Sequence, residues 1–190
     1  CFDKVYTLSE GYITTITGTP EIGKSLAIDN LTVGYAKNFG LHTAYYSPET
    51  KPTQFHISRL ASIYNGLKFG TPNDRDRMPY SEFKKAQEWI GKHYSFIQPK
   101  TNTLHEILAL AKLSVLQYGT QLLVIDPYSR INIGNDNEHN FIRNFLNDIG
   151  DFASKHRVAV FIVAHPTKMD AFGKGNKADE IKDYPLATPY

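Results

Sequence analysis

Eight residues near the start of the chain have the types and spacing of a phosphate-binding loop. Residues 18–25 read Gly-Thr-Pro-Glu-Ile-Gly-Lys-Ser, which matches the pattern G-x-x-x-x-G-K-S. In this pattern, backbone N–H groups surround the phosphates, Lys24 reaches the β- and γ-phosphates, and the Ser25 hydroxyl is a Mg²⁺ ligand. The helix that follows directs the positive end of its dipole at the same anion. The sequence therefore predicts a site for ATP or another nucleoside triphosphate with Mg²⁺, formed by Gly18, Thr19, Pro20, Glu21, Ile22, Gly23, Lys24, Ser25 and Leu26.

A second candidate ligand for the metal is Asp126, which ends a short apolar run. Residues 122–125 read Leu-Leu-Val-Ile, a pattern typical of a buried strand. An Asp at the end of such a strand can bind Mg²⁺, directly or through water, beside Ser25. Many Asp residues in this position cap a turn instead. The metal role is favoured here because the phosphate-binding loop lies upstream.

Two further polar residues come directly after apolar segments and are candidates for a role in hydrolysis. Glu49 follows residues 42–46, where a carboxylate could orient and polarise the attacking water. Glu21 is the rival, and an ordinary solvated glutamate is the alternative for Glu49. His165 follows residues 158–164 and could donate a hydrogen bond to the γ-phosphate. A structural histidine bonded to a backbone carbonyl is equally consistent with that position.

Two segments beside these residues are candidate nucleic-acid contacts. Basic loops next to a nucleotide site can follow a phosphate backbone and shift with nucleotide state. Residues 128–138 contain one candidate, Arg130, and residues 167–183 contain Lys168, Lys174, Lys177 and Lys182. The second segment also holds Asp170, Asp179, Glu180 and Asp183, so its net charge is near zero. An ordinary surface loop therefore stays open as the alternative for it.

Composition sets limits on the kind of protein. The chain has 190 residues, 41% of them apolar, which is enough for one α/β domain with a core. A net charge of +2 is nearly neutral, so any nucleic-acid surface must be local. The single cysteine, Cys1, allows no internal disulfide and fits a reducing compartment. The histidines other than His165 show no metal-ligand spacing, so no zinc site is predicted.

Strand-like and helix-like segments alternate along the chain. We expect strands at residues 12–17, 42–46, 94–97, 121–125 and 158–164, and helices at 24–39, 52–65, 81–92, 101–118 and 138–155. This alternation predicts an α/β fold, a mainly parallel sheet with helices on both faces. Ligands of such sheets bind at the carboxyl ends of the strands, where all the candidate chemical residues fall. The expected core-facing positions are Ile28, Leu31, Tyr35 and Phe39 in one helix and Ile142, Phe145, Leu146, Ile149 and Phe152 in another.

Four stretches occur in an order and at a spacing that resemble a known family: residues 18–25, Tyr-Ser-Pro-Glu at 46–49, Ile-Asp-Pro-Tyr at 125–128 and Val-Ala-His-Pro-Thr-Lys at 163–168. The chain resembles the RecA-type ATPase domain of DnaB-like hexameric replicative helicases. The likeness is greatest to phage-type primase–helicases and the mitochondrial replicative helicase. It extends over nearly the whole chain and implies a RecA-like P-loop fold. In that fold, the strand before His165 lies between the strand of the phosphate-binding loop and the strand of Asp126.

The resemblance also implies an activity. It implies a homo-oligomeric ring, a hexamer, that uses ATP and Mg²⁺ to move 5′ to 3′ on single-stranded DNA and to unwind duplex. Glu49 and Lys24 take catalytic positions, and His165 takes that of a γ-phosphate sensor. The loops with Arg130, Lys168, Lys174 and Lys177 take the places of the DNA-binding loops. A primase domain or partner is implied as well, in a bacterial or phage-infected cytoplasm or in a mitochondrial matrix.

The chain is interpreted as one ATPase domain truncated at both ends. It stops where the family's run-up to an arginine finger begins, so we expect this piece to bind nucleotide, hydrolyse it slowly and assemble poorly. A RecA-like recombinase, or another DNA-binding ATPase without unwinding activity, stays open as the alternative. Pro20, the Ser-Pro-Glu stretch and His165 fit that alternative less well. A nucleotide-binding scaffold without hydrolysis is disfavoured because Lys24, Glu49, Asp126 and His165 are all present.

Overall fold

The computed structural model describes residues 7–19, 21–51, 53–70, 74, 77–134 and 137–164. The elements of this part of the chain are β1 (Ile13–Thr17), α1 (Lys24–Phe39), β2 (Thr43–Tyr46), α2 (Thr53–Asn65), α3 (Tyr80–His93), β3 (Tyr94–Phe96), α4 (Leu104–Tyr118), β4 (Leu122–Ile125), the short 3₁₀ turn η2 (Tyr128–Arg130), α5 (Glu138–His156) and β5 (Ala159–Ala164). The predicted elements are confirmed, with bounds that differ by up to three residues. Among the described residues, no helix combines the length and apolarity needed to cross a membrane.

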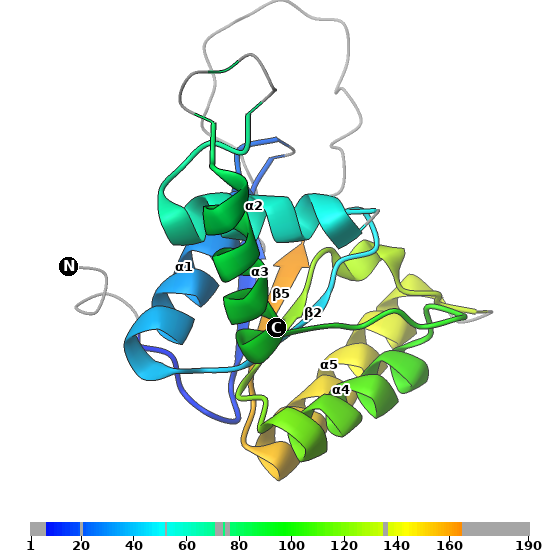
Figure 1. Cartoon of the computed structure of the whole chain (residues 1–190). Coiled ribbons are helices and arrows are strands. Elements are labelled where there is room, and N and C mark those ends of the chain that lie inside the picture. The colour runs from blue at the N-terminus through cyan, green and yellow to red at the C-terminus, as the bar shows by residue number, and fades with distance from the viewer. Residues whose placement is uncertain are drawn as a thin grey trace, which may run out of the picture.

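The strands form one parallel sheet in the order β1-β5-β4-β2-β3 (Figure 1). Thr17 at the end of β1 lies opposite Ala164 of β5, and Tyr46 at the end of β2 lies opposite Ile125 of β4. Because the strands are parallel and in this register, their carboxyl ends lie at one edge. The predicted position of β5, between β1 and β4, is confirmed.

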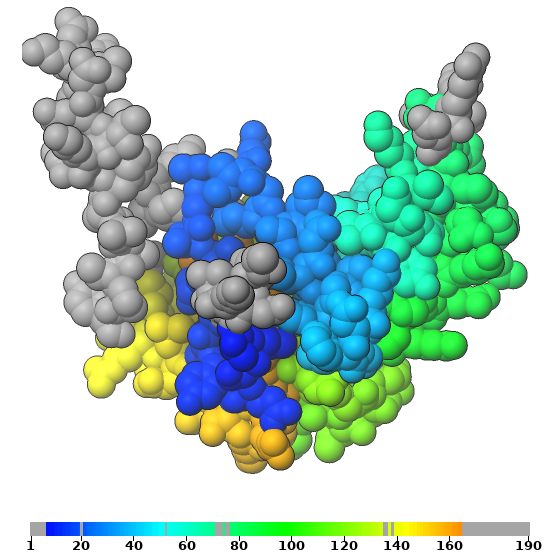
Figure 2. All heavy atoms as spheres, turned by 90° about the vertical axis from the view of Figure 1, so that its left-hand side faces the viewer, coloured from blue at the N-terminus to red at the C-terminus, as the bar shows by residue number. Residues whose placement is uncertain are grey.

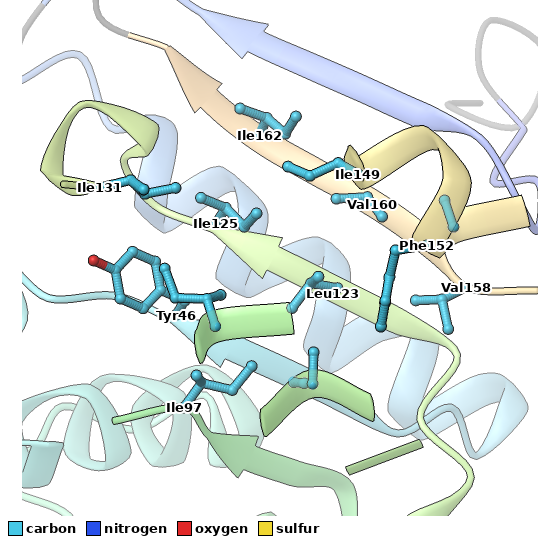
Figure 3. Close-up of a cluster of buried hydrophobic side chains, with 14 of the residues drawn as sticks. Tyr46, Ile97, Leu123, Ile125, Ile131, Ile149, Phe152, Val158, Val160 and Ile162 are labelled. Atoms are coloured by element: carbon cyan, nitrogen blue, oxygen red, sulfur yellow. The ribbon is translucent and has the colours of Figure 1, made fainter. Parts of the chain in front are cut away.

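Helices cover both faces of the sheet. Figure 1 shows α1, α2 and α3 on one face and α4 and α5 on the other. Successive strand residues alternate between the two cores: Leu122 and Val124 of β4 join the α1–α3 side, and Leu123 and Ile125 join the α4–α5 side. Figure 3 shows the second core, where side chains of β4 and β5 point toward Ile149 and Phe152 of α5. Because helices cover both faces of the sheet, β2 and β4 are buried at every position.

The prediction of core-facing positions is wrong for two residues. Phe39 is 72% exposed at the end of α1, and Leu146 is 41% exposed on α5. The buried stripe of α1 instead carries Ile28, Asp29, Thr32, Val33 and Ala36. A stripe assigned from apolar residues alone misses Asp29 and Thr32, which are buried because other side chains satisfy their hydrogen bonds.

The start of α4 is set by a cap. The Thr103 hydroxyl accepts a hydrogen bond from the backbone N–H of Glu106, so the helix begins at Leu104 and not at Thr101. The Glu106 carboxylate accepts bonds from the backbone N–H groups of Lys100 and Thr101. These bonds and the Thr101 hydroxyl, which contributes most, lower the pKa of Glu106. The segment before α4 is therefore held in a defined conformation next to the sheet edge.

Candidate functional site

The phosphate-binding loop connects β1 to α1 at the carboxyl edge of the sheet. Gly23 has φ 90°, in the left-handed region that glycine tolerates, and its carbonyl accepts the first helical bond from Ala27. No side chain among the described residues caps α1, and its first turn has no acidic residue. The backbone N–H groups at the start of α1 are therefore free to bind an anion, as the sequence predicts.

Lys24 is buried in this loop. Its side-chain Nζ donates hydrogen bonds to the carbonyl oxygens of Gly18, at 2.7 Å, and Thr19, at 2.8 Å. The residue is 7% exposed. The hydrogen-bond partners of Lys24 among the described residues are these two neutral carbonyls, and a phosphate would be a stronger partner because hydrogen bonds between charged groups are the stronger kind. The ammonium group is thus held within the loop by its own backbone carbonyls.

Ser25 and Asp126 lie next to each other, as the metal prediction requires. Asp126 directly follows β4, is 6% exposed, and its backbone N–H donates to the carbonyl of Tyr46 at 2.9 Å. Burial raises the pKa of the Asp126 carboxyl, and a hydrogen bond from the Ser25 hydroxyl opposes that rise. A buried carboxylate beside a hydroxyl forms an oxygen-donor pair of the kind that binds Mg²⁺ through a few protein ligands. These two residues fit a magnesium ion.

Three charged side chains act on Asp126 from nearby. Asp29 and Glu49 raise its pKa by repulsion, and the guanidinium of Arg59 lowers it. Repulsion between carboxylates is relieved when a divalent cation binds between them. The electrostatics of the site therefore favour a cation, although the described residues bring no group of three His, Cys, Asp or Glu side chains together as a metal cage.

Asp29 is the centre of a buried polar network that sequence reasoning missed. Its carboxylate accepts a hydrogen bond from the Tyr45 hydroxyl at 2.8 Å and one from Arg59 Nε at 2.5 Å, and His56 Nε2 lies 3.0 Å from its Oδ1. Asp29 and His56 are fully buried, and Arg59 is two-thirds buried. The network joins α1, β2 and α2. The sequence does contain one sign of this network: Asp29 lies four residues after Ser25, so it falls on the face of the helix that packs against the sheet.

Glu49 lies in the turn that follows β2, at the same edge as the phosphate-binding loop. The turn is held by a hydrogen bond from the Ser47 hydroxyl to Thr50 Oγ1 at 3.0 Å and by one from the Thr50 N–H to the Ser47 carbonyl at 3.3 Å. Glu49 accepts a hydrogen bond from Arg130 Nε at 2.6 Å. The structure thus brings a candidate catalytic residue into contact with a candidate nucleic-acid residue 81 positions away.

Several predicted site residues lie outside the part of the chain that the structure describes. These are Pro20, His165, Lys168, Lys174 and Lys177. Leu26, Ile22 and Glu21 are exposed at the start of α1 and in the loop before it. Figure 2 shows the blue residues of β1, the loop and α1 on the face viewed there, between α5 in yellow and α3 in green.

The described geometry defines a class of protein. The sheet is parallel, with the strand order β1-β5-β4-β2-β3. At its carboxyl edge lie the start of α1, which no described side chain caps, the buried Lys24, and the hydrogen-bonded Ser25 and Asp126. Together these features define a RecA-type P-loop nucleotide-binding domain.

Comparison with known proteins gives the family. Residues 6–171 match the AAA domain family, and the chain belongs to it. A Twinkle homolog protein, chloroplastic/mitochondrial, from Arabidopsis thaliana is 28% identical over 181 residues, which is 91% of this chain and 26% of that protein.

Solved structures share the fold. One, described as a DnaB-like replicative helicase and its interactions with primase, aligns with a TM-score of 0.72 and 16% identity, covering 88% of this chain and 43% of that one. The ATPase domain of G40P aligns with a TM-score of 0.73 and 15% identity, covering 88% and 62% of the two chains. This chain spans about a quarter of the length of the Arabidopsis relative. The RecA-like fold expected from the sequence is confirmed.

Proposed function

We propose that this chain is the ATP-hydrolysing motor of a replicative DNA helicase, acting as one RecA-like domain within a hexameric ring. It would couple hydrolysis to 5′-to-3′ movement on single-stranded DNA, with a primase domain or partner. The observation that carries the proposal is the convergence of the phosphate-binding loop, Glu49 and Asp126 at the ends of β1, β2 and β4. Nucleic acid as the client is supported by the descriptions of the relatives, a Twinkle homolog and a DnaB-like helicase.

Each residue has a proposed task in binding. Lys24 would exchange its carbonyl partners for the β- and γ-phosphate oxygens of the nucleotide. Ser25 and Asp126 would hold Mg²⁺, which neutralises developing charge on the phosphates when bound. The N–H groups at the start of α1 would bind phosphate oxygens. Burial raises the pKa of Asp126, so a bound cation would offset the cost of keeping this carboxylate charged.

Hydrolysis would depend on Glu49 and His165. Glu49 is proposed to orient and polarise the attacking water, a task that needs a carboxylate within hydrogen-bond reach. His165 is proposed to sense the γ-phosphate, and Arg130, Lys168, Lys174 and Lys177 to contact the phosphates of DNA.

The test is ATP hydrolysis by the intact protein with and without single-stranded DNA. We expect DNA to stimulate turnover, Lys24→Ala to abolish it, and Lys84→Ala, on the exposed side of α3, to leave it unchanged. A forked duplex with a 5′ tail should be unwound in preference to one with a 3′ tail. Hydrolysis that is indifferent to DNA would exclude the helicase and favour a RecA-fold ATPase with another client. DNA-stimulated hydrolysis with filament formation and no unwinding would favour the recombinase alternative.

The role of Glu49 has its own test. Glu49→Gln keeps the shape of the side chain and removes the proton acceptor, so turnover should fall by about 10²- to 10⁴-fold. Nucleotide affinity should stay within about twofold, because the variant retains every proposed phosphate contact. Unchanged turnover in Glu49→Gln would refute the assignment.

A further inference from the structure

The contact between Glu49 and Arg130 joins two regions whose proposed tasks differ. Arg130 Nε donates a hydrogen bond to Glu49 Oε1 at 2.6 Å. Glu49 follows β2, and Arg130 ends the η2 turn that follows Asp126 and β4. The two strands are neighbours in the sheet, which is why residues so distant in sequence meet at its edge.

The backbone around Arg130 is held firmly. The Tyr46 hydroxyl donates to the Arg130 carbonyl at 3.3 Å, and the Asn132 N–H donates to the Asn102 carbonyl at 2.9 Å. Ile131 is 4% exposed, and Figure 3 shows its side chain directed into the α4–α5 core. The main chain on both sides of Arg130 therefore has little freedom to move.

The side chains of the pair are, by contrast, open to solvent. The Arg130 side chain is 62% exposed and that of Glu49 is 43% exposed. A polyanion approaching this edge can reach the guanidinium without any rearrangement of the backbone. The guanidinium can form the same type of hydrogen bond with a phosphate oxygen as with a carboxylate, so the two anions compete for it.

The contact also affects what Glu49 can do. A carboxylate that orients a water must place its oxygen within hydrogen-bond reach of that water. While Arg130 holds Oε1, the side chain is restrained toward η2 and one of its oxygens is occupied. Glu49 is thus less able to orient the attacking water while it is paired with Arg130 than after its release.

We propose that Arg130 restrains Glu49 in the absence of nucleic acid, and that a backbone phosphate of single-stranded DNA releases Glu49 by binding Arg130. Arg130 is thereby a positioning residue that acts through Glu49. This inference rests on the proposed function, because it needs Glu49 to be catalytic and nucleic acid to be the client. It supplies a direct route from DNA binding to faster hydrolysis.

The exposure of the pair limits the size of the effect. Exposed ion pairs of this kind shift an equilibrium by a factor of about 1.4 to 5. Arg130→Ala should therefore raise the turnover of the intact protein without DNA by about 1.4- to 5-fold. The stimulation by single-stranded DNA, taken as the ratio of the two rates, should fall by at least the same factor.

A second exposed pair provides a matched control. Arg157 Nε donates to Glu10 Oε2 at 2.9 Å, next to the amino ends of β1 and β5 and away from the nucleotide site. Arg157→Ala removes this pair together with one positive charge, as Arg130→Ala does, and should change neither rate. A change of the same size in Arg157→Ala and Arg130→Ala would overturn the proposal, because the effect would then be a general one of lost positive surface charge.

The contact can be observed directly as well. In an NMR spectrum of arginine Nε–Hε groups, the Arg130 signal, identified by its loss in Arg130→Lys, should shift on addition of an oligothymidylate. ATP with Mg²⁺ alone should leave the signal in place. A shift caused by ATP alone would overturn the proposal, because the releasing phosphate would then be that of the nucleotide.

The rate measurements separate this inference from the proposed function. If wild-type turnover is stimulated by DNA and Arg130→Ala leaves both rates unchanged, the restraint is excluded and the helicase proposal stands. A lower DNA-free rate in Arg130→Ala would also exclude it, because Arg130 would then assist hydrolysis. If wild-type turnover does not respond to DNA, the proposed function itself fails.

Discussion

The side-chain nitrogen of Lys24 lies 2.7 Å from the carbonyl oxygen of Gly18, so the phosphate-binding loop is closed on its own lysine. A second bond to the Thr19 carbonyl completes this arrangement. In the proposed binding of a nucleotide, the lysine would exchange these two carbonyl partners for phosphate oxygens.

Lys24→Ala should weaken nucleotide binding by about 10- to 100-fold, because it removes a charge-assisted contact worth about 1.5–3 kcal/mol. The measurement is a fluorescence titration with an ATP analogue that carries a reporter on the ribose. Lys84→Ala, on the exposed side of α3, is the matched control and should bind like the wild type. Affinity within a factor of two of the wild type in Lys24→Ala would contradict the assignment of the loop.

Asp126→Asn should stabilise the ligand-free protein and should remove most of the further stabilisation that Mg²⁺ gives. Burial raises the folded pKa of Asp126 above the unfolded value of about 3.9. As pH rises, the unfolded state loses its proton first, so the free energy of unfolding falls between the two pKa values and stays reduced at neutral pH. An asparagine carries no charge to bury and should add about 0.5–2 kcal/mol at pH 7.

Urea unfolding at pH 7, with and without Mg²⁺ and nucleotide, measures both effects of Asp126→Asn. The ligands should stabilise the wild type and have much less effect on the variant, because only the native site binds them. Asp148→Asn, on the exposed side of α5, is the control and should show neither change. A variant less stable than the wild type without ligand would show that the carboxylate is structural.

Asp29→Ala should destabilise the fold by about 3–5 kcal/mol, because it leaves the charged Arg59, which is two-thirds buried, without its carboxylate partner. The Tyr45 hydroxyl loses its acceptor as well. Chemical denaturation at neutral pH measures the loss, and Asp151→Ala, exposed on α5, is the control. A loss below about 1 kcal/mol, the size expected of an exposed pair, would mean that the network adds little stability.

His42 should make the protein sensitive to acid. Burial, with a smaller contribution from His93, lowers the pKa of His42 from 6.5 to about 4. The unfolded state therefore binds this proton first as pH falls, and stability is lost between pH 6.5 and about 4. At 1.36 kcal/mol per pKa unit, the difference between 6.5 and about 4 corresponds to an expected loss of about 3 kcal/mol.

The free energy of unfolding of His42→Asn should change less over this range, although the variant starts lower because it loses the contact of Nδ1 with Thr120 Oγ1 at 2.9 Å. His105→Asn, exposed on α4, should keep the wild-type slope. Equal slopes for the wild type and His42→Asn between pH 6.5 and 4 would show that another group is responsible.

Local patterns were sufficient to predict the elements of the fold. The helix at residues 24–39 was predicted with the bounds that it has, because a glycine ends it and the phosphate-binding motif begins it. The seven apolar residues at 158–164 predicted a strand covered on both faces, and all six residues of β5 lie in the sheet with five of them buried. These features depend on backbone preference and on periodicity, which are properties of short segments.

The exposed Phe39 and Leu146 show where this reasoning fails. Each is apolar and spaced to face the core, yet each is exposed, because no element in the described part of the chain covers it. Conversely, Asp29 and Thr32 are polar and fully buried, because Tyr45, His56 and Arg59 come from other elements to bond with Asp29. Whether a side chain is buried depends on which elements pack against it. The periodicity of one helix carries no information about those elements.

By itself, the sequence determined the phosphate-binding loop, the parallel α/β class and the carboxyl-edge positions of Glu49 and Asp126, because each follows from a local motif and the rule that places ligands at strand ends. Only the tertiary structure decided that Ser25 bonds with Asp126, that Asp29 organises a buried network and that Arg130 holds Glu49. These contacts join residues that are 101, 27 and 81 positions apart in the sequence. The order of strands in the sheet brings them together, and no spacing along the chain encodes that order directly.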